Sequence, residues 1–528
     1  MKRMFLSGLK IFYKMKKNNF YITTPVYYPS GEPHMGHAYS SILADVFARF
    51  YRNDNSKVYF LTGTDEHGLK IQKTAEKNGL EPLIYCDKMS QVFKNLAKKL
   101  NLSNDDFIRT TEKRHYKAVN DLWNKLFKSG DIYLSKYKGW YSMSDEAYYN
   151  SDEVIEKNGK KFSTFSGSSV EWVEEESFFF KLSLWQNKLL EFYDKNENFI
   201  LPISRRNEVI NFVRGGLKDL SVSRTSFTWG IKVPNNDKHI IYVWLDALTN
   251  YISALNFPNV KDELYKNFWP ASLHVIGKDI LRFHAIYWPA FLLAAGLKPP
   301  NRVFGHGWIL SGDEKMSKSK GNILNPLEII DTYGIDELRY YLMKEVSHGS
   351  DGSISLDSLK RCINSDLANN YGNLCQRVFS FVKNNCNNKI SKVKNISESD
   401  KKLIDQTNIL TKNLRRDMYN QNLNNYIKSV IDISFLTNKY INDEEPWKLK
   451  NNNVEKMNNI LHILLEQIAK ISILLNPIIP NASTKVLDAL NIINKIRNHD
   501  FLDGNNLIPN EIQINELNIL FNEGSFAW

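Results

Sequence analysis

The sequence predicts an α/β protein in which a parallel sheet is split by an α+β insertion and followed by an all-α bundle. Three observations support this fold class: a strand–helix–strand pattern near the start, strand-like segments that return after residue 236, and helical periodicity without strands beyond about residue 355. A chain of 528 residues, 42% of them hydrophobic, can bury a large core and divide into several domains.

The first half of the sheet is expected over residues 19–115. The segment "NFYITTPVYY" has the β-branched and aromatic content of a buried strand, and "PSGEP" supplies a turn. The next segment, "AYSSILADVFARFYR", places apolar residues at helical spacing, and "KVYFLTG" is again strand-like. A strand, a helix and a strand in this order predict a parallel sheet with a crossover helix.

Three further regions follow. Residues 116–236 are aromatic, acidic and turn-rich, as in "VEWVEEESFFFKLS", which predicts an inserted α+β domain. The sheet is expected to resume over residues 237–355, where we interpret "IIYVWLDAL", "LHVIGKDI" and "RVFGHGWI" as short strands or strand ends. Over residues 356–528 Leu, Ile and Val recur at helical spacing as far as about residue 495, which predicts a helical bundle.

Bulk composition narrows the function classes. The net charge of +11 suits a polyanionic partner, although a diffuse excess of lysine also forms ordinary solvated surface. The four cysteines form no CxxC pair, so neither disulfides nor a cysteine-based zinc site is indicated, and we expect a reducing compartment. The longest apolar stretch, residues 285–297, is shorter than the roughly 20 residues of a membrane span, so we expect a buried helix and no membrane association.

Residues 1–18 are basic, and no acidic residue precedes Glu32. The segment lacks the apolar core of a secretory signal and the Arg and Ser content of most transit peptides, which favours a disordered extension. A translation start at Met15 and import into an organelle both remain open.

Two histidines, His34 and His37, flank Gly36 where the first helix is expected to begin. Backbone N–H groups and the helix dipole favour an anion at such a terminus, and an open parallel sheet binds ligands at the same edge. Two imidazoles would add donors for phosphate oxygens, and the glycine would let the ligand approach closely. Taken alone, a pair of structural histidines explains this pattern equally well.

A second cluster, "SGDEKMSKSKGNILNP", covers residues 311–326 and brings Lys315, Ser317 and Lys318 into a glycine-bounded loop. Ammonium groups on a mobile loop can close over a polyphosphate and stabilise the charge that develops as phosphorus is attacked. A solvated basic loop is the alternative interpretation.

Together, "PHMGH" and "KMSKS" resemble the paired signatures of the class I aminoacyl-tRNA synthetases. Further segments, among them "FLTGTDEHGLKIQKTAEKNG", "YVWLDALTNYISAL", "HVIGKDILRFHAIYWPAFLLAAGL" and "EPWKL", resemble the methionyl-tRNA synthetases of the bacterial and organellar type, from residue 19 through the bundle. The resemblance implies a Rossmann-like catalytic domain that forms methionyl-adenylate from L-methionine and ATP and then transfers methionine to tRNA(Met), initiator tRNA included. Another class I synthetase of neighbouring specificity and a catalytically silent tRNA-binding protein remain alternatives.

The resemblance also implies roles for particular residues. The catalytic residues would be His34, His37, Lys315 and Lys318, and Gly36 and Ser317 would join them in binding ATP, which Mg²⁺ would accompany. Aromatic walls suit the polarisable thioether of methionine, and Asp65 would bind its ammonium group. Without the resemblance, Trp244 and Trp288 would be interpreted as core residues. The methionine pocket would consist of Val26, Tyr28, Asp65, Trp244, Ala247, Leu248, Tyr251, Ile280, His284 and Trp288.

In the bundle, the resemblance implies that Asn373, Arg377 and Trp447 bind the anticodon, by base-edge hydrogen bonds and stacking. Many family members carry zinc knuckles in the insertion, but residues 116–236 contain no cysteine, so we expect no structural zinc. No appended β-barrel is recognisable after the bundle, which favours a monomer. We expect the protein in the cytoplasm, with the matrix of a mitochondrion or another organelle as the alternative if residues 1–14 act as a targeting segment.

Overall fold

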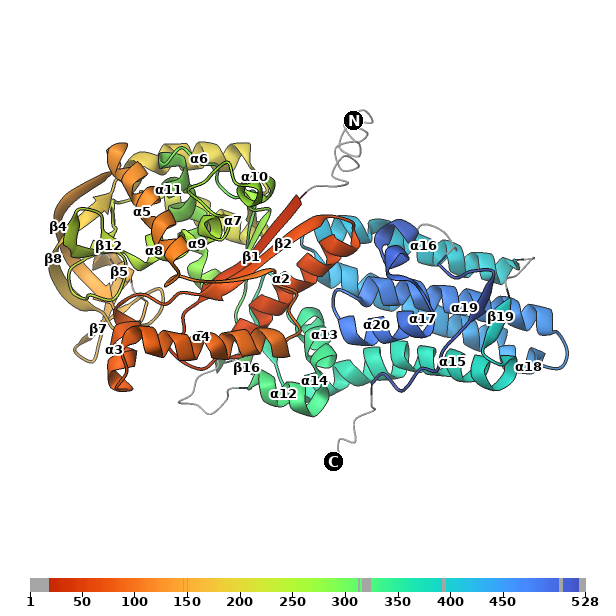
Figure 1. The fold of residues 1–528 in the computed structure, drawn as a ribbon. Helices are drawn as coiled ribbons and strands as arrows, with labels where there is room; N and C mark the ends of the chain where they lie inside the picture. Colours follow the sequence, from red (N-terminus) through yellow and green to blue (C-terminus); the bar gives the residue numbers. More distant parts are fainter. Residues whose placement is uncertain are drawn as a thin grey trace.

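The structure is a computed structural model in which the α/β part and the helical bundle lie side by side (Figure 1). Among the described residues, no helix combines the length and the apolar character needed to cross a membrane. The basic segment of residues 1–18 lies outside the described residues. The description covers residues 19–145, 147–149, 151–311, 314–315, 324–391, 396–502 and 507–521.

A six-stranded, entirely parallel sheet of the Rossmann-like type confirms the predicted fold class. The two halves of the sheet meet where Ile22 pairs with Leu273, so the chain between them is inserted into one continuous sheet. The strands lie in the order β3 (Asp106–Arg109), β2 (Lys57–Thr64), β1 (Asn19–Tyr27), β14 (Leu273–Gly277), β15 (Val303–His306) and β9 (Ile200–Leu201).

Both faces of this sheet are buried, which explains why its strands have nearly continuous apolar sequences. Phe20 and Ile22 of β1 contribute to one core, whereas Tyr21 between them contributes to the other. The first core contains α2 (Met35–Asn53) and α13 (Ile335–Glu345), and it continues into the bundle. The second core contains α5 (Lys113–Lys128), α8 (Val243–Leu248), α9 (Asn250–Ser253), α10 (Glu263–Phe268) and α11 (Trp288–Ala294).

The inserted region is richer in antiparallel strands, but it is not separate from the main sheet. Strand β9 falls within residues 116–236, which we predicted to be the insertion, yet it pairs with β15 at the edge of the parallel sheet. Two residues of strand give no detectable period-2 pattern, which is why the sequence did not reveal it. The inserted antiparallel sheet has the order β10 (Leu220–Ser221), β8 (Glu171–Phe180), β4 (Ile132–Ser142), β5 (Ala147–Tyr149), beside the hairpin β6 (Val154–Lys157) and β7 (Lys160–Ser163).

The segment "IIYVWLDAL" differs from the strand that the sequence favoured. Only its first residues belong to a strand, β13 (Asn236–Ile241), and the rest forms helix α8. The apolar run covers both elements because both are buried, and periodicity alone does not separate them. The strands flanking β13 are β11 (Ser223–Arg224) and β12 (Lys232–Val233), and the remaining helices of this part are α3 (Leu69–Lys77), α4 (Pro82–Lys99), α6 (Gln186–Lys195) and α7 (Ile203–Arg214).

A small sheet follows β15 and precedes the bundle. It has the order β17 (Glu314–Lys315), β16 (Ile309–Ser311) and β18 (Gly352–Ile354), and α12 (Pro326–Tyr333) leads from it into α13. The side chain of Asn325 caps α12 by accepting a hydrogen bond from the backbone N–H of Leu327, and Pro326 occupies the first turn.

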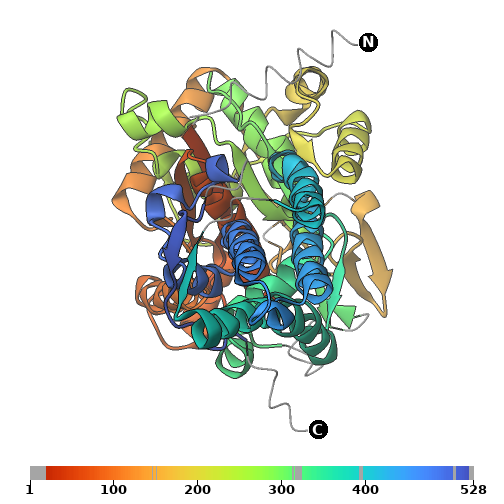
Figure 2. The same ribbon diagram turned by 90° about the vertical axis from the view of Figure 1, so that its right-hand side faces the viewer.

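The bundle confirms the predicted helical region, and Figure 2 shows several of its long helices nearly end-on, packed side by side. The expectation that strands stop near residue 355 is wrong in one detail, since β19 (Lys389–Ser391) pairs with β20 (Glu511–Gln513). The helices are α14 (Leu356–Cys362), a π-helical segment (Ile363–Gly372), α15 (Asn373–Cys386), α16 (Glu398–Tyr419), α17 (Leu423–Glu444), α18 (Pro446–Leu449), α19 (Val454–Leu475) and α20 (Pro480–Ala489).

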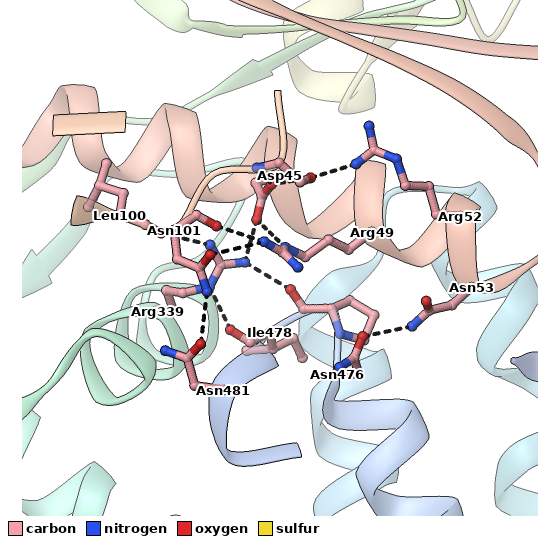
Figure 3. Close-up of polar contacts among 12 residues, drawn as sticks. Asp45, Arg49, Arg52, Asn53, Leu100, Asn101, Arg339, Asn476, Ile478 and Asn481 are labelled. Carbon is pink, nitrogen blue, oxygen red and sulfur yellow. Dashed lines mark hydrogen bonds and ion pairs between the residues drawn. The ribbon is translucent and has the colours of Figure 1, made fainter. Parts of the chain in front are cut away.

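A buried polar network fixes α2 against the bundle (Figure 3). The guanidinium of Arg339, on α13, donates to the Asp45 carboxylate of α2 at 2.7 Å, and both side chains are fully buried. It also donates to the carbonyl oxygens of Ile478 at 2.8 Å, Pro477 at 2.9 Å and Leu100 at 3.1 Å. Burial would raise the pKa of Asp45, but the neighbouring guanidinium groups outweigh it and hold that pKa below its usual value.

The C-terminal end of α2 is attached to the bundle as well. Asp54, which follows the helix, accepts a hydrogen bond from Arg415 Nε at 2.7 Å and another from the hydroxyl of Tyr419. Asn53 donates to Asn476 at 3.2 Å. One helix therefore connects the carboxyl edge of the sheet to the helical bundle.

Candidate active site

A cavity of about 490 Å³ opens at the carboxyl edge of the parallel sheet. The ends of β1, β2, β14 and β15 reach its wall through Tyr27, Asp65, Gly277 and His306 respectively. Open α/β sheets bind ligands at this edge, where strand ends and helix N-termini meet. The position of the cavity therefore agrees with the prediction from "PHMGH".

His34 and His37 line this cavity at the N-terminus of α2. His34 Nδ1 accepts a hydrogen bond from the backbone N–H of Gly36 at 3.1 Å, and His37 Nδ1 accepts one from the backbone N–H of His34 at 3.0 Å. An imidazole whose Nδ1 accepts carries its proton on Nε2. Each ring therefore has an Nε2–H donor besides the backbone N–H groups of the helix terminus, as binding of phosphate oxygens requires.

The two rings lie against each other, with centroids 3.9 Å apart. Burial of its ring, together with His34 beside it, lowers the pKa of His37 well below its usual value. His37 is therefore neutral at neutral pH, so its ring can offer a hydrogen-bond donor but not a full positive charge.

Gly36 leaves room for the packing of this motif. A Cβ at this position would lie 3.0 Å from Cε1 and 3.1 Å from Nδ1 of His34. A side chain here would be tight against the His34 ring, which would have to shift by a few tenths of an ångström, so the glycine lets the ring keep its capping position.

Nine of the ten residues predicted for the methionine pocket line the cavity; they are Val26, Tyr28, Asp65, Trp244, Ala247, Leu248, Tyr251, Ile280 and His284.

Trp288 is the exception. It is completely buried, and its ring lies beside Tyr251, with centroids 6.2 Å apart, and beside Trp269. The sequence pattern does not distinguish Tyr251, which lines the cavity, from Trp288, which packs beside it.

An aromatic wall faces the cavity from two neighbouring segments. Trp244 of α8 stacks on Phe283, with ring centroids 3.6 Å apart and planes 5° apart. Phe283 begins a π-helical segment, Phe283–Tyr287, that runs into α11, and π-helical turns are frequent at functional sites.

His284, in the same segment, holds the neighbouring wall. Its Nδ1–H donates to the Ile280 carbonyl at 3.0 Å, and its Nε2 accepts from the Tyr251 hydroxyl at 2.7 Å. Burial lowers the pKa of His284 to about 4. Both hydrogen bonds are made by the neutral ring, which is thus the form that the site requires at neutral pH.

Several lining residues were not singled out from the sequence. Asp279 and Trp308 follow β14 and β15, and Trp308 Nε1 donates to Asp279 at 3.3 Å. Their position directly after strands of the parallel sheet was an available signal, because such residues gather at the ligand edge. The insertion also reaches the cavity, through Ser144, Asp145, Tyr149, Phe165 and Ser166, and no local pattern announced this contact.

The lysine-rich loop is described only at its start. Trp308 and Ile309 line the cavity, and in the next pairing the backbone of Lys315 lies opposite Leu310. The loop therefore begins beside the cavity. Ser317 and Lys318 lie outside the described residues.

The residues predicted to bind the anticodon lie far along the bundle from the cavity. Arg377 of α15 donates to Asn442 at 2.8 Å, and its guanidinium lies 5.8 Å from the ring centroid of Trp447. Trp447 is 42% exposed, so part of its ring is available for stacking. Asn373 is exposed at the start of the same helix, one turn before Arg377.

Within the described part of the chain, no group of three or more His, Cys, Asp or Glu side chains could hold a metal ion.

Comparison with known proteins agrees with this arrangement. The family model described as "tRNA synthetases class I (M)" matches residues 20–379, and the model for the anticodon binding domain of methionyl tRNA ligase matches residues 390–523. The fold, the cavity and these matches define a class I tRNA synthetase.

Named relatives narrow the class. The methionine–tRNA ligase of Brucella suis is 47% identical over 90% of this chain and 92% of its own, and that of Rickettsia typhi is 47% identical over 94% and 99%. The solved structure of Mycobacterium tuberculosis methionyl-tRNA synthetase in complex with methionyl-adenylate is 40% identical, with a TM-score of 0.93 over 96% of this chain and 99% of that one. The chain belongs to the methionine–tRNA ligase family.

Proposed function

We propose that the cavity activates L-methionine with ATP and that the enzyme then transfers the methionyl group to the 3′ end of tRNA(Met). The observation that carries this proposal is the shared position of two features: paired Nε2–H donors at the N-terminus of α2, and an apolar, aromatic pocket with a carboxylate, all lining one cavity. A related structure contains methionyl-adenylate, the product of such a step.

In the first step, a carboxylate oxygen of methionine attacks the α-phosphorus of ATP and pyrophosphate leaves. No covalent bond to the protein is needed, so catalysis rests on positioning and on stabilisation of charge. His34 and His37 donate to phosphate oxygens, and the loop that contains Lys315, Ser317 and Lys318 places cations against the leaving pyrophosphate. Mg²⁺ enters as the partner of ATP.

The amino acid is recognised at the other end of the cavity. Asp65 accepts hydrogen bonds from the ammonium group of methionine, and Tyr28, Trp244, Leu248 and Tyr251 surround its side chain. A thioether is polarisable and gains from aromatic neighbours. Since one methylene is worth only about 1–3 kcal/mol in an apolar pocket, leucine and homocysteine are the competitors to test.

Residues 19–115 and 237–355 carry this chemistry, and residues 356–528 bind the anticodon through Asn373, Arg377 and Trp447. The proposed enzyme serves both elongator and initiator tRNA(Met). It acts as a monomer without structural zinc, in the cytoplasm or in an organelle matrix.

Amino-acid-dependent exchange of pyrophosphate into ATP, without tRNA, tests this function. We expect exchange with methionine and at least about tenfold lower kcat/KM with leucine, isoleucine, cysteine and homocysteine. A higher kcat/KM with one of the others would assign a neighbouring specificity, and no exchange with any of them would favour a tRNA-binding protein without catalysis.

A further inference from the structure

A carboxylate that does not touch the cavity lies between the elements that build it. Asp246 of α8 is completely buried, and so is His115, while His67 is 1% exposed. Asp246 Oδ2 is 2.7 Å from His67 Nδ1, and its Oδ1 is 2.6 Å from His115 Nε2. None of the three residues lines the cavity.

The distances in this cluster fit the following arrangement of its protons. With Asp246 ionised, both imidazoles donate to it, and their other nitrogens can accept. His67 Nε2 accepts from the Tyr116 hydroxyl at 3.1 Å, and His115 Nδ1 accepts from the Ser253 hydroxyl at 2.8 Å. Burial would raise the pKa of Asp246, but the two histidines outweigh it and lower that pKa. Every ring nitrogen thus has a partner, as a buried polar cluster requires.

Each of these bonds leads to a different wall of the pocket. Asp246 lies on the same short helix as Trp244, Ala247 and Leu248, which line the cavity. His67 follows Asp65 by two residues, and its carbonyl accepts from the Tyr28 hydroxyl at 2.8 Å.

The bond through His115 reaches a third wall. His115 belongs to α5, and its partner Ser253 lies on α9 with Tyr251. One carboxylate therefore links the loop of the ammonium ligand, the helix of the aromatic wall and the helix of Tyr251.

We propose that Asp246 is a positioning residue for amino-acid recognition: through His67 and His115 it fixes the distance between the Asp65 carboxylate and the Trp244 wall. The inference rests on the proposed methionine site. A pocket built around one side-chain length discriminates only if its charged end and its apolar end hold a constant separation, so loss of this link affects specificity as well as affinity.

Asp246→Asn is the informative substitution because it keeps the shape of the side chain. Its Oδ1 can still accept from His67, and its Nδ2–H can donate to His115 Nε2 if that ring moves its proton to Nδ1 and donates to Ser253. The cluster stays hydrogen-bonded but loses its charge, so the variant is expected to fold.

The assay is methionine-dependent pyrophosphate exchange, with the fraction of active enzyme measured by the burst of adenylate. In Asp246→Asn we expect KM for methionine to rise about tenfold or more, because hydrogen bonds to a charged group are lost. KM for ATP should change less than about twofold, because the ATP end of the site makes no bond to this cluster, and the kcat/KM ratio of methionine over homocysteine should fall about threefold or more. A purely structural role would instead lower the active fraction with KM and the ratio unchanged, and that result overturns the inference.

Two paired variants make the outcome independent of folding. His115→Gln keeps a donor close to Nε2, whereas His115→Phe removes it, so KM for methionine should lie nearer to wild type in His115→Gln. Equal values in the two would contradict the role of Asp246. Asp65→Asn tests the underlying site: if it leaves KM for methionine unchanged, the proposed methionine site itself is wrong. If it raises KM while Asp246→Asn does not, only the positioning role fails.

Discussion

Replacing Arg339 by methionine tests how firmly α2 is held to the bundle. Arg339→Met keeps most of the volume but removes the guanidinium that bonds Asp45 and the carbonyls of Leu100, Pro477 and Ile478. The carboxylate is not left alone, since Arg49 Nε still donates to it at 2.8 Å and Ser103 donates twice at 2.6 Å. The main loss is therefore the shared ion pair together with three buried carbonyl bonds.

Breaking a buried ion pair costs about 3–5 kcal/mol, and a buried carbonyl without a donor costs about 1–3 kcal/mol. The remaining donors partly compensate Asp45, and water can reach the carbonyls in a loosened interface. We therefore expect the free energy of unfolding to fall by about as much as the ion pair alone costs, about 3–5 kcal/mol. Urea unfolding followed by tryptophan fluorescence measures this loss of stability. In calorimetry of Arg339→Met, we expect the α/β part and the bundle to unfold in separate transitions.

The matched control is Lys428→Met, which breaks an exposed ion pair with Asp432 at 2.7 Å. Its effect should stay within about 0.5 kcal/mol. Combining Arg339→Met with Asp45→Asn should cost less than the sum of the two single changes, because the two side chains share one interaction. A loss below about 1 kcal/mol for Arg339→Met, with a single unshifted transition, would refute the reasoning.

Four further outcomes are expected. Gly36→Ala should slow pyrophosphate exchange about tenfold with little change in the unfolding midpoint, because the new Cβ displaces the His34 ring; an unchanged rate would contradict this. The folded His284 pKa of about 4 lies below its usual 6.5, so the unfolded chain binds more protons between these values. Stability should accordingly fall by up to about 3 kcal/mol as the pH drops from 6.5 to 4, and His284→Gln should flatten that slope in urea titrations; an unaltered slope counts against the assignment. Trp447→Ala should lower tRNA charging about tenfold while tRNA-independent exchange persists, whereas equal losses would indicate misfolding and Phe435→Ala serves as the exposed aromatic control in the same bundle. Elemental analysis should find less than about 0.1 zinc per chain, and about one per chain would disprove the expectation.

The parts that the sequence predicted best are those with strong local patterns. The junction between β1 and α2 combines a buried strand, a turn and an amphipathic helix within about 35 residues, so short-range periodicity determines it. The cavity at that junction followed from topology, because parallel strands bring their carboxyl ends to one edge.

The parts that the sequence did not predict depend on distant contacts. β9 is two residues long, and its pairing with β15 is set by tertiary packing across about 100 residues. Helix α8 looked like the end of a strand because five of its six residues are buried and its apolar sequence is nearly continuous. Asp246 drew no attention, since a single aspartate in an apolar run has no partner in its neighbourhood; its partners come from other elements.

The length of α2 has a practical consequence for protein engineering. At about 1.5 Å per residue, its 19 residues reach almost 30 Å, with the cavity-lining histidines at one end and Asp54 at the other. Grafting an anticodon module from a relative would therefore need matching donors for Asp45 and Asp54, because Arg339 and Arg415 would be exchanged together with the graft. The junction of a chimera should lie before α13. Arg339 and residues 477–481 then come from the same parent protein, and the bonds between them are kept.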